Sequence, residues 1–372
     1  MALTSKQIQA FGLDISDSSV KIMMLHKKGS LIRPLSFGAE IFSRGIVVKD
    51  EIKEPAKLAE IIKQTIEKAK PQAINTPYVI ASLPESKSFI RMFDLPPMKK
   101  EEIPAAVKWE AEQHIPMSID QVEMDWQIMD HEKKTKKGKF LETKKPEEKA
   151  RSHRILLTAA PKDIVSPTVE VLKQAGLQPV ALEIESISTA RSCISPTLAQ
   201  QNVMIVDIGT NRSGISILNS GLIEFTSSLA MAGVDITQNI MRLSGLSFAE
   251  AEKAKISFGL DQAKQQPVIL QAIDETLKKI TSEIRNTISY HQERSENEDK
   301  IGHILLCGGT SRLQGLGAYF AKELPIPVHL ANPWINLFET GSKDLPPISS
   351  TDSLSFTAVI GLAQRGFDFN LP

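Results

Sequence analysis

The sequence predicts an α/β protein made of two related halves, with a smaller α+β segment inserted between them. Residues 11–40 and 204–233 show the same order of features: an apolar strand ending in Asp-Ile, a polar turn, a second strand, a Gly-containing turn and a third strand. Segments with apolar residues at helical spacing separate the predicted strands. The alternation of strands and helices favours mixed sheets, and the identical order of elements favours duplication over two unrelated hairpins.

Three helices are predicted from periodicity. One follows Pro55, which suits a first helical turn, and a second ends before Gly176. The longest is expected over residues 268–291, with one apolar face formed by Leu270, Ile273, Leu277, Ile280, Ile284 and Ile288.

The predicted insertion covers residues 86–178. Strands are expected over 89–94, 122–129 and 155–159, with a helix over 101–114. Within it, residues 131–151 are rich in Lys and Glu and almost free of apolar residues. This pattern is typical of a solvated hairpin loop; the alternative is a contact with lipid headgroups or with a partner.

Composition excludes several classes of function. Lys plus Arg and Asp plus Glu both number 44, so the net charge is zero, which argues against nucleic acid as the main partner. The first ten residues lack a signal-peptide pattern, and no apolar run approaches the ~18 to 20 residues of a membrane span. We therefore expect a cytoplasmic protein whose association with a membrane is indirect. Cys193 and Cys307 have no metal-ligand spacing and are expected to be reduced thiols.

The turn in the second copy of the repeat has features of a phosphate site. Gly209 lets the backbone approach a ligand closely, the successive amides that follow can form an anion nest, and Thr210 adds a hydroxyl. Asp207, at the end of the preceding strand, can orient the waters that Mg²⁺ keeps.

Two further turns repeat this chemistry. Asp14 occupies the equivalent position in the first copy, and Lys21 follows within reach of a phosphate. Gly308 and Gly309 lie between an apolar strand and a helix predicted over 313–322, where a phosphate or ribose can approach. Each turn alone is equally typical of an ordinary tight turn, but three in this order indicate a nucleotide site.

These turns resemble the phosphate-1, phosphate-2 and adenosine motifs of the actin, Hsp70 and FtsA superfamily. Segments 158–191, 246–259 and 358–366 are similar, more narrowly, to the PilM family of pilus assembly proteins. The resemblance covers nearly the whole chain. It implies a duplicated actin-like (RNase H-like) fold, with two lobes around a nucleotide cleft and an inserted SHS2-type subdomain. The implied subdomains are 1A (1–85, completed by 179–200 and 345–372), 1C (86–178), 2A (201–244 and 301–344) and 2B (245–300).

The same resemblance implies roles for individual residues. Asp14 and Asp207 would hold Mg²⁺, largely through water, and act in catalysis with Glu185, which is favoured over Glu183 as the water-activating carboxylate. The implied phosphate contacts are Ser16, Asp17, Ser18, Ser19, Lys21, Gly209, Thr210 and Asn211. The implied adenosine contacts are Glu252, Lys255, Gly308, Gly309, Thr310 and Ser311. For Glu252 and Lys255 the plain alternative is an exposed ion pair.

The resemblance also implies ATP with Mg²⁺ as cofactors and a PilN-like membrane protein as partner. That partner's cytosolic N-terminal peptide would bind between 1A and 1C, together with other pilus machine components, at the cytoplasmic face of the inner membrane. Ser16 stands where the family usually has Gly, and Asp17 adds a negative charge, so we expect weak ATPase activity at most. The alternatives are an actin-fold metabolite kinase and a nucleotide-free interaction module of a related secretion system.

The last residues, 367–372, resemble the Asn-Leu-Pro core of the partner peptide. A frayed terminus is the plain alternative. Otherwise, two Phe side chains and a Leu on an exposed tail would gain from burial in the chain's own groove or in a neighbour's, where they would compete with the partner peptide. Burial in a neighbour's groove would give head-to-tail self-assembly.

Overall fold

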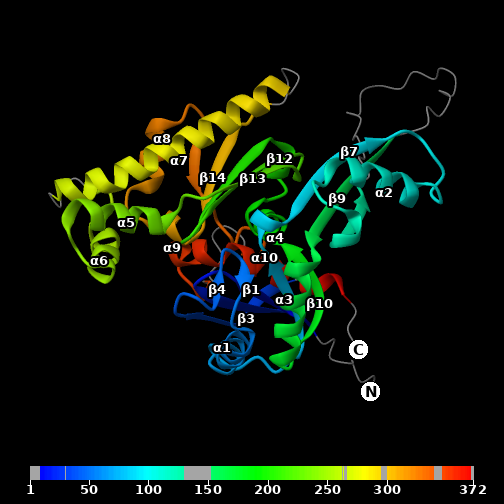
Figure 1. The fold of residues 1–372 in the computed structure, drawn as a ribbon, viewed down its shortest axis with the longest axis horizontal. Coiled ribbons are helices and arrows are strands. Elements are labelled where there is room, and N and C mark those ends of the chain that lie inside the picture. Colours follow the sequence, from blue (N-terminus) through cyan, green and yellow to red (C-terminus); the bar gives the residue numbers. More distant parts are fainter. Residues whose placement is uncertain are drawn as a thin grey trace. The chain divides into compact units, whose positions relative to one another are not determined.

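The computed structural model describes residues 9–29, 31–129, 152–261, 263, 266–294, 300–338 and 346–369 (Figure 1). Contacts divide the chain into two compact units. One contains residues 1–86 and 166–372, and the other contains residues 87–165. The Lys-rich segment 131–151 lies outside the described residues.

The first sheet of the larger unit has the strand order β10-β6-β1-β2-β3. Its first three strands form an antiparallel meander, while β6 and β10 run parallel to β1. Apolar residues of α1 and α3 pack with one face of this sheet, and residues of α10 pack with the other. The elements are β1 (Phe11–Ile15), β2 (Ser19–Lys28), β3 (Leu31–Ile41), β6 (Tyr78–Leu83), β10 (Gln178–Ile184), α1 (Pro55–Glu67), α3 (Lys162–Gln174), α4 (Glu185–Cys193) and α10 (Thr357–Arg365). A small hairpin, β4 (Val47–Val48) and β5 (Glu51–Ile52), follows β3.

The second sheet repeats this plan, with the order β13-β12-β11-β14-β15. Its meander is again antiparallel, and β14 and β15 again run parallel to the first strand of the repeat. The predicted duplication is therefore present in the sheet topology. The elements are β11 (Val203–Ile208), β12 (Ser213–Asn219), β13 (Leu222–Leu229), β14 (His303–Cys307), β15 (Val328–Leu330), α5 (Gly233–Ser244), α6 (Phe248–Phe258), α7 (Pro267–Arg294), α8 (Leu316–Glu323) and α9 (Ser350–Ser353).

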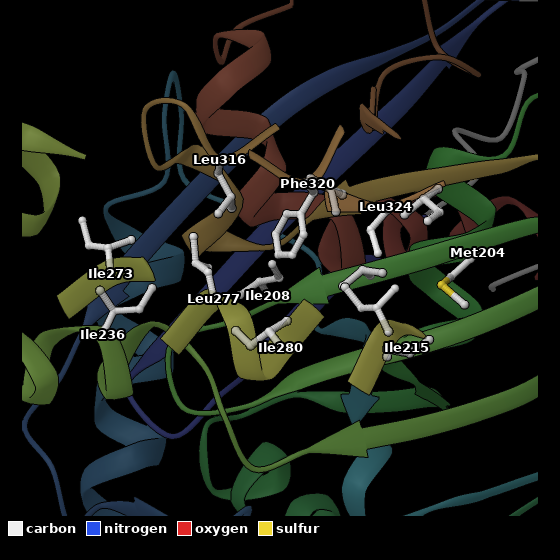
Figure 2. Packing of buried hydrophobic residues seen from close by; sticks show 14 of the residues in the cluster. Met204, Ile208, Ile215, Ile236, Ile273, Leu277, Ile280, Leu316, Phe320 and Leu324 are labelled. Atoms are coloured by element: carbon white, nitrogen blue, oxygen red, sulfur yellow. The ribbon is translucent and has the colours of Figure 1, made fainter. Parts of the chain in front are cut away.

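The long helix α7 supplies much of the core of this second half. Ile273, Leu277 and Ile280 lie on one face, as their spacing predicts, and are fully buried (Figure 2). They pack in one cluster with β11 and with Phe320 of α8. Burial of a side chain of this size stabilises a fold by roughly 1.5 to 3 kcal/mol, so this face fixes α7 to the sheet.

A close helix contact holds the segment that links the two sheets. A Cβ atom added to Gly361 of α10 would lie 1.8 Å from the carbonyl oxygen of Ser188 in α4. Only Gly allows the two helices to approach this closely. Because α4 leads directly toward β11, this contact fixes the start of the second half against the first sheet.

The smaller unit is a three-stranded antiparallel sheet with the order β7-β9-β8. The apolar face of α2 packs in one cluster with its strands. Its elements are β7 (Phe89–Leu95), α2 (Ile103–His114), β8 (Val122–Ile128) and β9 (His153–Pro161). None of the helices in the described part of the chain has the length and apolar character of a membrane span.

Three sequence expectations need correction. The insertion was expected to extend to residue 178, but the smaller unit ends at 165, because Val171 and Leu172 of α3 are buried in the core of the first sheet. The helix expected from residue 313 begins at Leu316, since a short 3-10 helix occupies Gly309–Arg312. Phe367 and Phe369 do not lie on a free tail: both are partly buried against the larger unit. Residues 370–372 lie outside the described residues.

Candidate functional site

A cavity of about 880 Å³ lies in the larger unit where the turns after β1, β11 and β14 meet. Every site residue predicted from the sequence lines it except Ser311. Ser311 is buried outside the lining, and its hydroxyl donates to the carbonyl oxygen of Cys307, so the structure gives no support to its predicted role as a ligand contact. The three turns, far apart in sequence, thus face one cavity.

The first turn is closed by its own side chains. Ser16 Oγ accepts a hydrogen bond from the Ser19 amide at 3.1 Å and lies 2.9 Å from Ser19 Oγ. A serine hydroxyl can stabilise a turn in this way where a Gly would be free. Asp17 directs its carboxylate to two donors, the Asp50 amide at 2.9 Å and the Asn211 side-chain amide at 3.4 Å. Burial raises the pKa of Asp17, and the charge of Arg212 opposes the rise.

The second and third turns are bonded to each other. Thr310 Oγ1 donates to the carbonyl oxygen of Gly209 at 2.7 Å, and the Gly233 amide donates to the same oxygen at 3.1 Å. Gly308 has φ +86°, and a Cβ atom there would lie 2.2 Å from Asp207 Oδ1. Thr310 therefore lines the cavity but uses its hydroxyl to fix the Gly209 turn, and Gly308 makes room for the Asp207 carboxylate.

Acidic side chains gather at the floor of the cavity. Burial raises the pKa of Asp207 to about 6, the charge of Asp14 adds to the rise, and the Lys21 ammonium opposes it. Burial, together with the charges of Asp14 and Asp207, holds the pKa of Glu185 well above its usual range. Lys21 Nζ lies 3.5 Å from Asp14 Oδ2, while the buried Asp14 Oδ1 has no hydrogen-bond partner. These carboxylates are therefore close enough to repel one another.

Glu183 and Glu185, the two candidates for the water-activating carboxylate near the start of α4, have different surroundings. Glu183 is buried and paired with Arg191 and Arg365, away from the residues that line the cavity. Glu185 lines the cavity and lies 3.4 Å from a guanidinium nitrogen of Arg212. The change from strand to helix at Ile184 turns the chain between these two acids.

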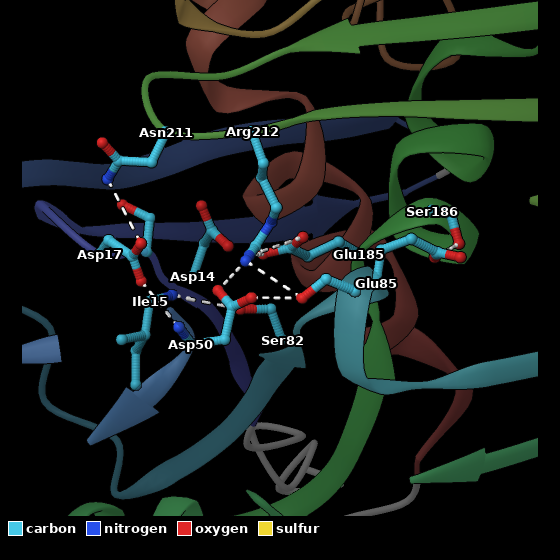
Figure 3. A network of polar contacts seen from close by, with 12 residues as sticks. Asp14, Ile15, Asp17, Asp50, Ser82, Glu85, Glu185, Ser186, Asn211 and Arg212 are labelled. Atoms are coloured by element: carbon cyan, nitrogen blue, oxygen red, sulfur yellow. Dashed lines mark hydrogen bonds and ion pairs between the residues drawn. The ribbon is translucent and has the colours of Figure 1, made fainter. Parts of the chain in front are cut away.

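Arg212 is the main site residue that sequence reasoning missed. Its guanidinium contacts Asp50 and Glu185, and its Nη1 lies 3.5 Å from Ser86 Oγ (Figure 3). Burial lowers its pKa, and the charges of Asp17 and Asp14 oppose that effect. The only available signal was its position in the Gly209 turn; Asp50, its partner, lies in a hairpin without a strand pattern.

The opposite wall of the cavity is formed by α6. Glu252 lines the cavity and accepts hydrogen bonds from Lys255 Nζ at 2.8 Å and Thr237 Oγ1 at 2.5 Å, both at Oε2. Lys255 is buried, and its other contacts are the Gly233 carbonyl oxygen and Thr237. The pair is thus not an exposed ion pair. Glu252 Oε1 keeps capacity for a ligand hydroxyl, while Lys255 stabilises the contact between α5 and α6.

The cavity also has an apolar rim with one contact between the halves. The Arg44 guanidinium lies 4.5 Å from the ring centroid of Phe248, and both residues line the cavity. Ile41 and Ile256, also in the lining, are strongly exposed. An acidic floor with backbone turns, a polar wall and an apolar rim could accommodate a ligand with phosphate, sugar and planar base.

Comparison with known proteins gives the family context. A family model described as type IV pilus assembly protein PilM matches residues 12–367. The cell division protein FtsA of Pseudomonas aeruginosa is 25% identical over 181 residues, covering 44% of this chain and 43% of that protein. The ethanolamine utilization protein EutJ of Escherichia coli is 25% identical over 174 residues, covering 46% and 55%. The chain thus spans about half the length of these relatives.

Solved structures share the fold over almost the whole chain. A chain of a PilM-PilN type IV pilus biogenesis complex has a TM-score of 0.76 at 24% identity, with 97% of this chain and 99% of that one covered. MreB5 of Spiroplasma citri bound to AMPPNP has a TM-score of 0.51 at 14% identity, with 95% of each chain covered. These matches confirm the predicted actin-like fold.

The raised pKa of Asp207 predicts a pH-dependent stability without any ligand. Its folded-state pKa of about 6 exceeds the usual value, so its stabilising contribution is present below pH ~4 and lost as pH rises through 6. Asp207→Asn should therefore raise the unfolding midpoint of the metal-free protein at pH 7.5, with a smaller gain at pH 5. Thermal unfolding measures this. Glu67→Gln, an exposed acid of α1, is the control; a gain independent of pH would contradict the assignment.

Proposed function

The chain belongs to the family of the type IV pilus assembly protein PilM, and from this premise we propose that it is an ATP-binding scaffold of a type IV pilus machine. The observation that carries the proposal is the single cavity lined by the turns at Asp14, Asp207 and Gly308. The structural match to MreB5 bound to AMPPNP shows that a related fold holds a nucleotide. We propose that the phosphates lie on the amides of the Asp14 and Gly209 turns and that the ribose meets Glu252.

The acidic floor supports Mg²⁺ as the companion of the nucleotide. Asp14 Oδ1, in a residue only 7% exposed, lacks a donor, and a metal-bound water would supply one. Within the described residues, no group of three or more His, Cys, Asp or Glu side chains could hold a metal on its own. We therefore propose that Mg²⁺ enters with the nucleotide, takes phosphate and water ligands, and reduces the repulsion between the phosphates and Asp14, Asp207 and Glu185.

Nucleotide binding is testable with a variant that fills the cavity. Gly309 lines the cavity, and a Cβ atom there would meet only Ser355 Cβ, at 3.8 Å, so Gly309→Val should fold and block the ligand. Calorimetric titration should detect Mg²⁺-ATP binding to the wild type, at least about tenfold weaker binding to Gly309→Val and Asp207→Asn, and little binding without Mg²⁺. Gly317→Ala, in α8 outside the cavity lining, is the matched control. Equal affinity in all variants would place the nucleotide elsewhere.

We further propose a membrane protein like PilN as partner, recognised through its cytosolic N-terminal peptide. The support is family membership and the structural match to the PilM-PilN complex. Attachment to the cytoplasmic face of the inner membrane would then be indirect, and other pilus machine components would assemble on the same scaffold.

A nucleotide switch requires that the two ligands affect each other's affinity. Because such coupling is reciprocal, Mg²⁺-ATP should change the affinity for the partner's N-terminal peptide by about fivefold or more, and the peptide should change ATP affinity equally. Fluorescence anisotropy with a labelled peptide measures the first effect, and calorimetry measures the second. A scrambled peptide is the control. Equal peptide affinity with and without Mg²⁺-ATP would contradict the switch, and no binding would contradict the partner.

We propose that hydrolysis, where it occurs, uses Glu185 to accept a proton from water. Because the pKa of Glu185 is raised, the carboxylate form that can accept this proton becomes more populated as pH rises. Phosphate release should therefore be slow and should increase as pH rises above the usual range of a carboxyl pKa. Glu185→Gln should abolish it while ATP binding persists, and Glu67→Gln should leave it unchanged. Equal turnover in Glu185→Gln would show that another group activates water.

A further inference from the structure

The β4–β5 hairpin has a turn that most side chains avoid. Its two turn residues, Lys49 and Asp50, have φ of +50° and +69°. Two-residue hairpins of this shape favour Asn, Asp and Gly, so Asp50 suits its position, whereas Lys49 is a residue that rarely adopts the left-handed region. The turn places the Asp50 carboxylate, only 6% exposed, against Arg212 from the second half of the repeat. The turn thus presents one nearly buried carboxylate to Arg212.

Asp50 belongs to a set of contacts between the hairpin, the first turn and the second turn (Figure 3). Arg212 pairs with Asp50, and the neighbouring Asn211 donates to Asp17 Oδ2 at 3.4 Å. The Asp50 amide donates to Asp17 Oδ1 at 2.9 Å, which joins the two acids into one unit. Both donors from the second half therefore belong to the turn that carries Gly209, and both acceptors belong to the first half.

We propose that Arg212 is a phosphate-binding residue that Asp50 holds in reserve. When a nucleoside triphosphate enters, the guanidinium moves from Asp50 to a terminal phosphate oxygen, and the contact between the halves opens. The inference rests on the proposed nucleotide function and adds a residue and a latch to it. Among the described residues, Arg212 lines the cavity whereas Asp50 does not, so the guanidinium lies between its present partner and the space that phosphates would occupy.

The exchange is chemically balanced. A guanidinium binds carboxylate and phosphate oxygens with the same forked geometry, so a phosphate can replace Asp50 as acceptor. The remaining contacts of Arg212, to Glu185 at 3.4 Å and Ser86 Oγ at 3.5 Å, are long. Ser86 Oγ also donates to Asp50 Oδ2, so the Asp50 carboxylate keeps a donor after Arg212 has left. Neither side of the pair is then left without a partner.

Removing the charge of Asp50 tests whether Arg212 leaves this carboxylate for a phosphate or stays paired with it. Asp50→Asn keeps the shape, and Asn tolerates the left-handed turn. Without the competing charge, calorimetric affinity for Mg²⁺-ATP should rise about tenfold, and the gain for Mg²⁺-ADP should be smaller. Arg212→Gln should weaken ATP binding about tenfold and ADP binding less. In the double variant the gain from Asp50→Asn should vanish, because it acts through Arg212.

The matched control is Glu51→Gln, which removes the exposed acid next to Asp50 that pairs with Lys53. It should leave both affinities unchanged, and unfolding midpoints verify that each variant is folded. ATP binding by the wild type with no gain in Asp50→Asn, or with no loss in Arg212→Gln, would overturn this inference alone. Absence of ATP binding in the wild type and in every variant would overturn the proposed function and this inference with it.

Discussion

Mutual repulsion among the buried carboxylates at the ends of β1 and β11 is the constraint around which the larger unit is arranged. Asp14 and Asp207 occupy equivalent positions in the two sheets, and Glu185 adds a third acid from α4. The two copies differ in what faces each Asp across the hairpin: Lys21 pairs in register with Asp14, whereas Gly214 pairs with Asp207. The positive charge of Lys21 therefore acts on both acids: it pairs with Asp14 and opposes the rise in the pKa of Asp207.

The apolar framework holds these acids in place. Strands β1 and β11 are buried almost throughout, and the cores behind them, including the face of α7, fix the strand ends. The close approach of Gly361 to Ser188 positions α4, whose first residue is Glu185, near the charge of Asp14. Strain of this kind at a site persists only where the surrounding packing determines it. Neutralisation by a bound cation would relieve it.

Much of the fold was predictable because it depends on local patterns. The duplicated meander and the helical face of α7 follow from alternation and from spacing. The end of the insertion was not predictable, because the apolar face of α3 specifies a helix but not the sheet it covers. The residues that line the cavity were predictable where they belong to motifs, as Asp207 and Gly308 do. The ion pair of Arg212 with Asp50 was missed because its two residues lie far apart in the sequence, and because Asp50 belongs to a hairpin whose strands have only two residues each.

Ser16 and Asp17 differ from the usual family pattern of the first turn, and their contacts in the structure show how the turn accommodates them. From sequence alone, an acid in the first phosphate turn should repel a nucleotide. In the structure, however, both Asp17 oxygens have donors, and one donor, Asn211, comes from the other half. The Ser16 hydroxyl stabilises the turn by accepting a hydrogen bond from the Ser19 amide. With Asp17 and Asp50 engaged by Asn211 and Arg212, the same groups that could meet phosphate already connect the halves. With the proposed transfer of Arg212 to a phosphate, ligand binding would change the contact between the halves, which is the property that a switched scaffold needs more than rapid turnover.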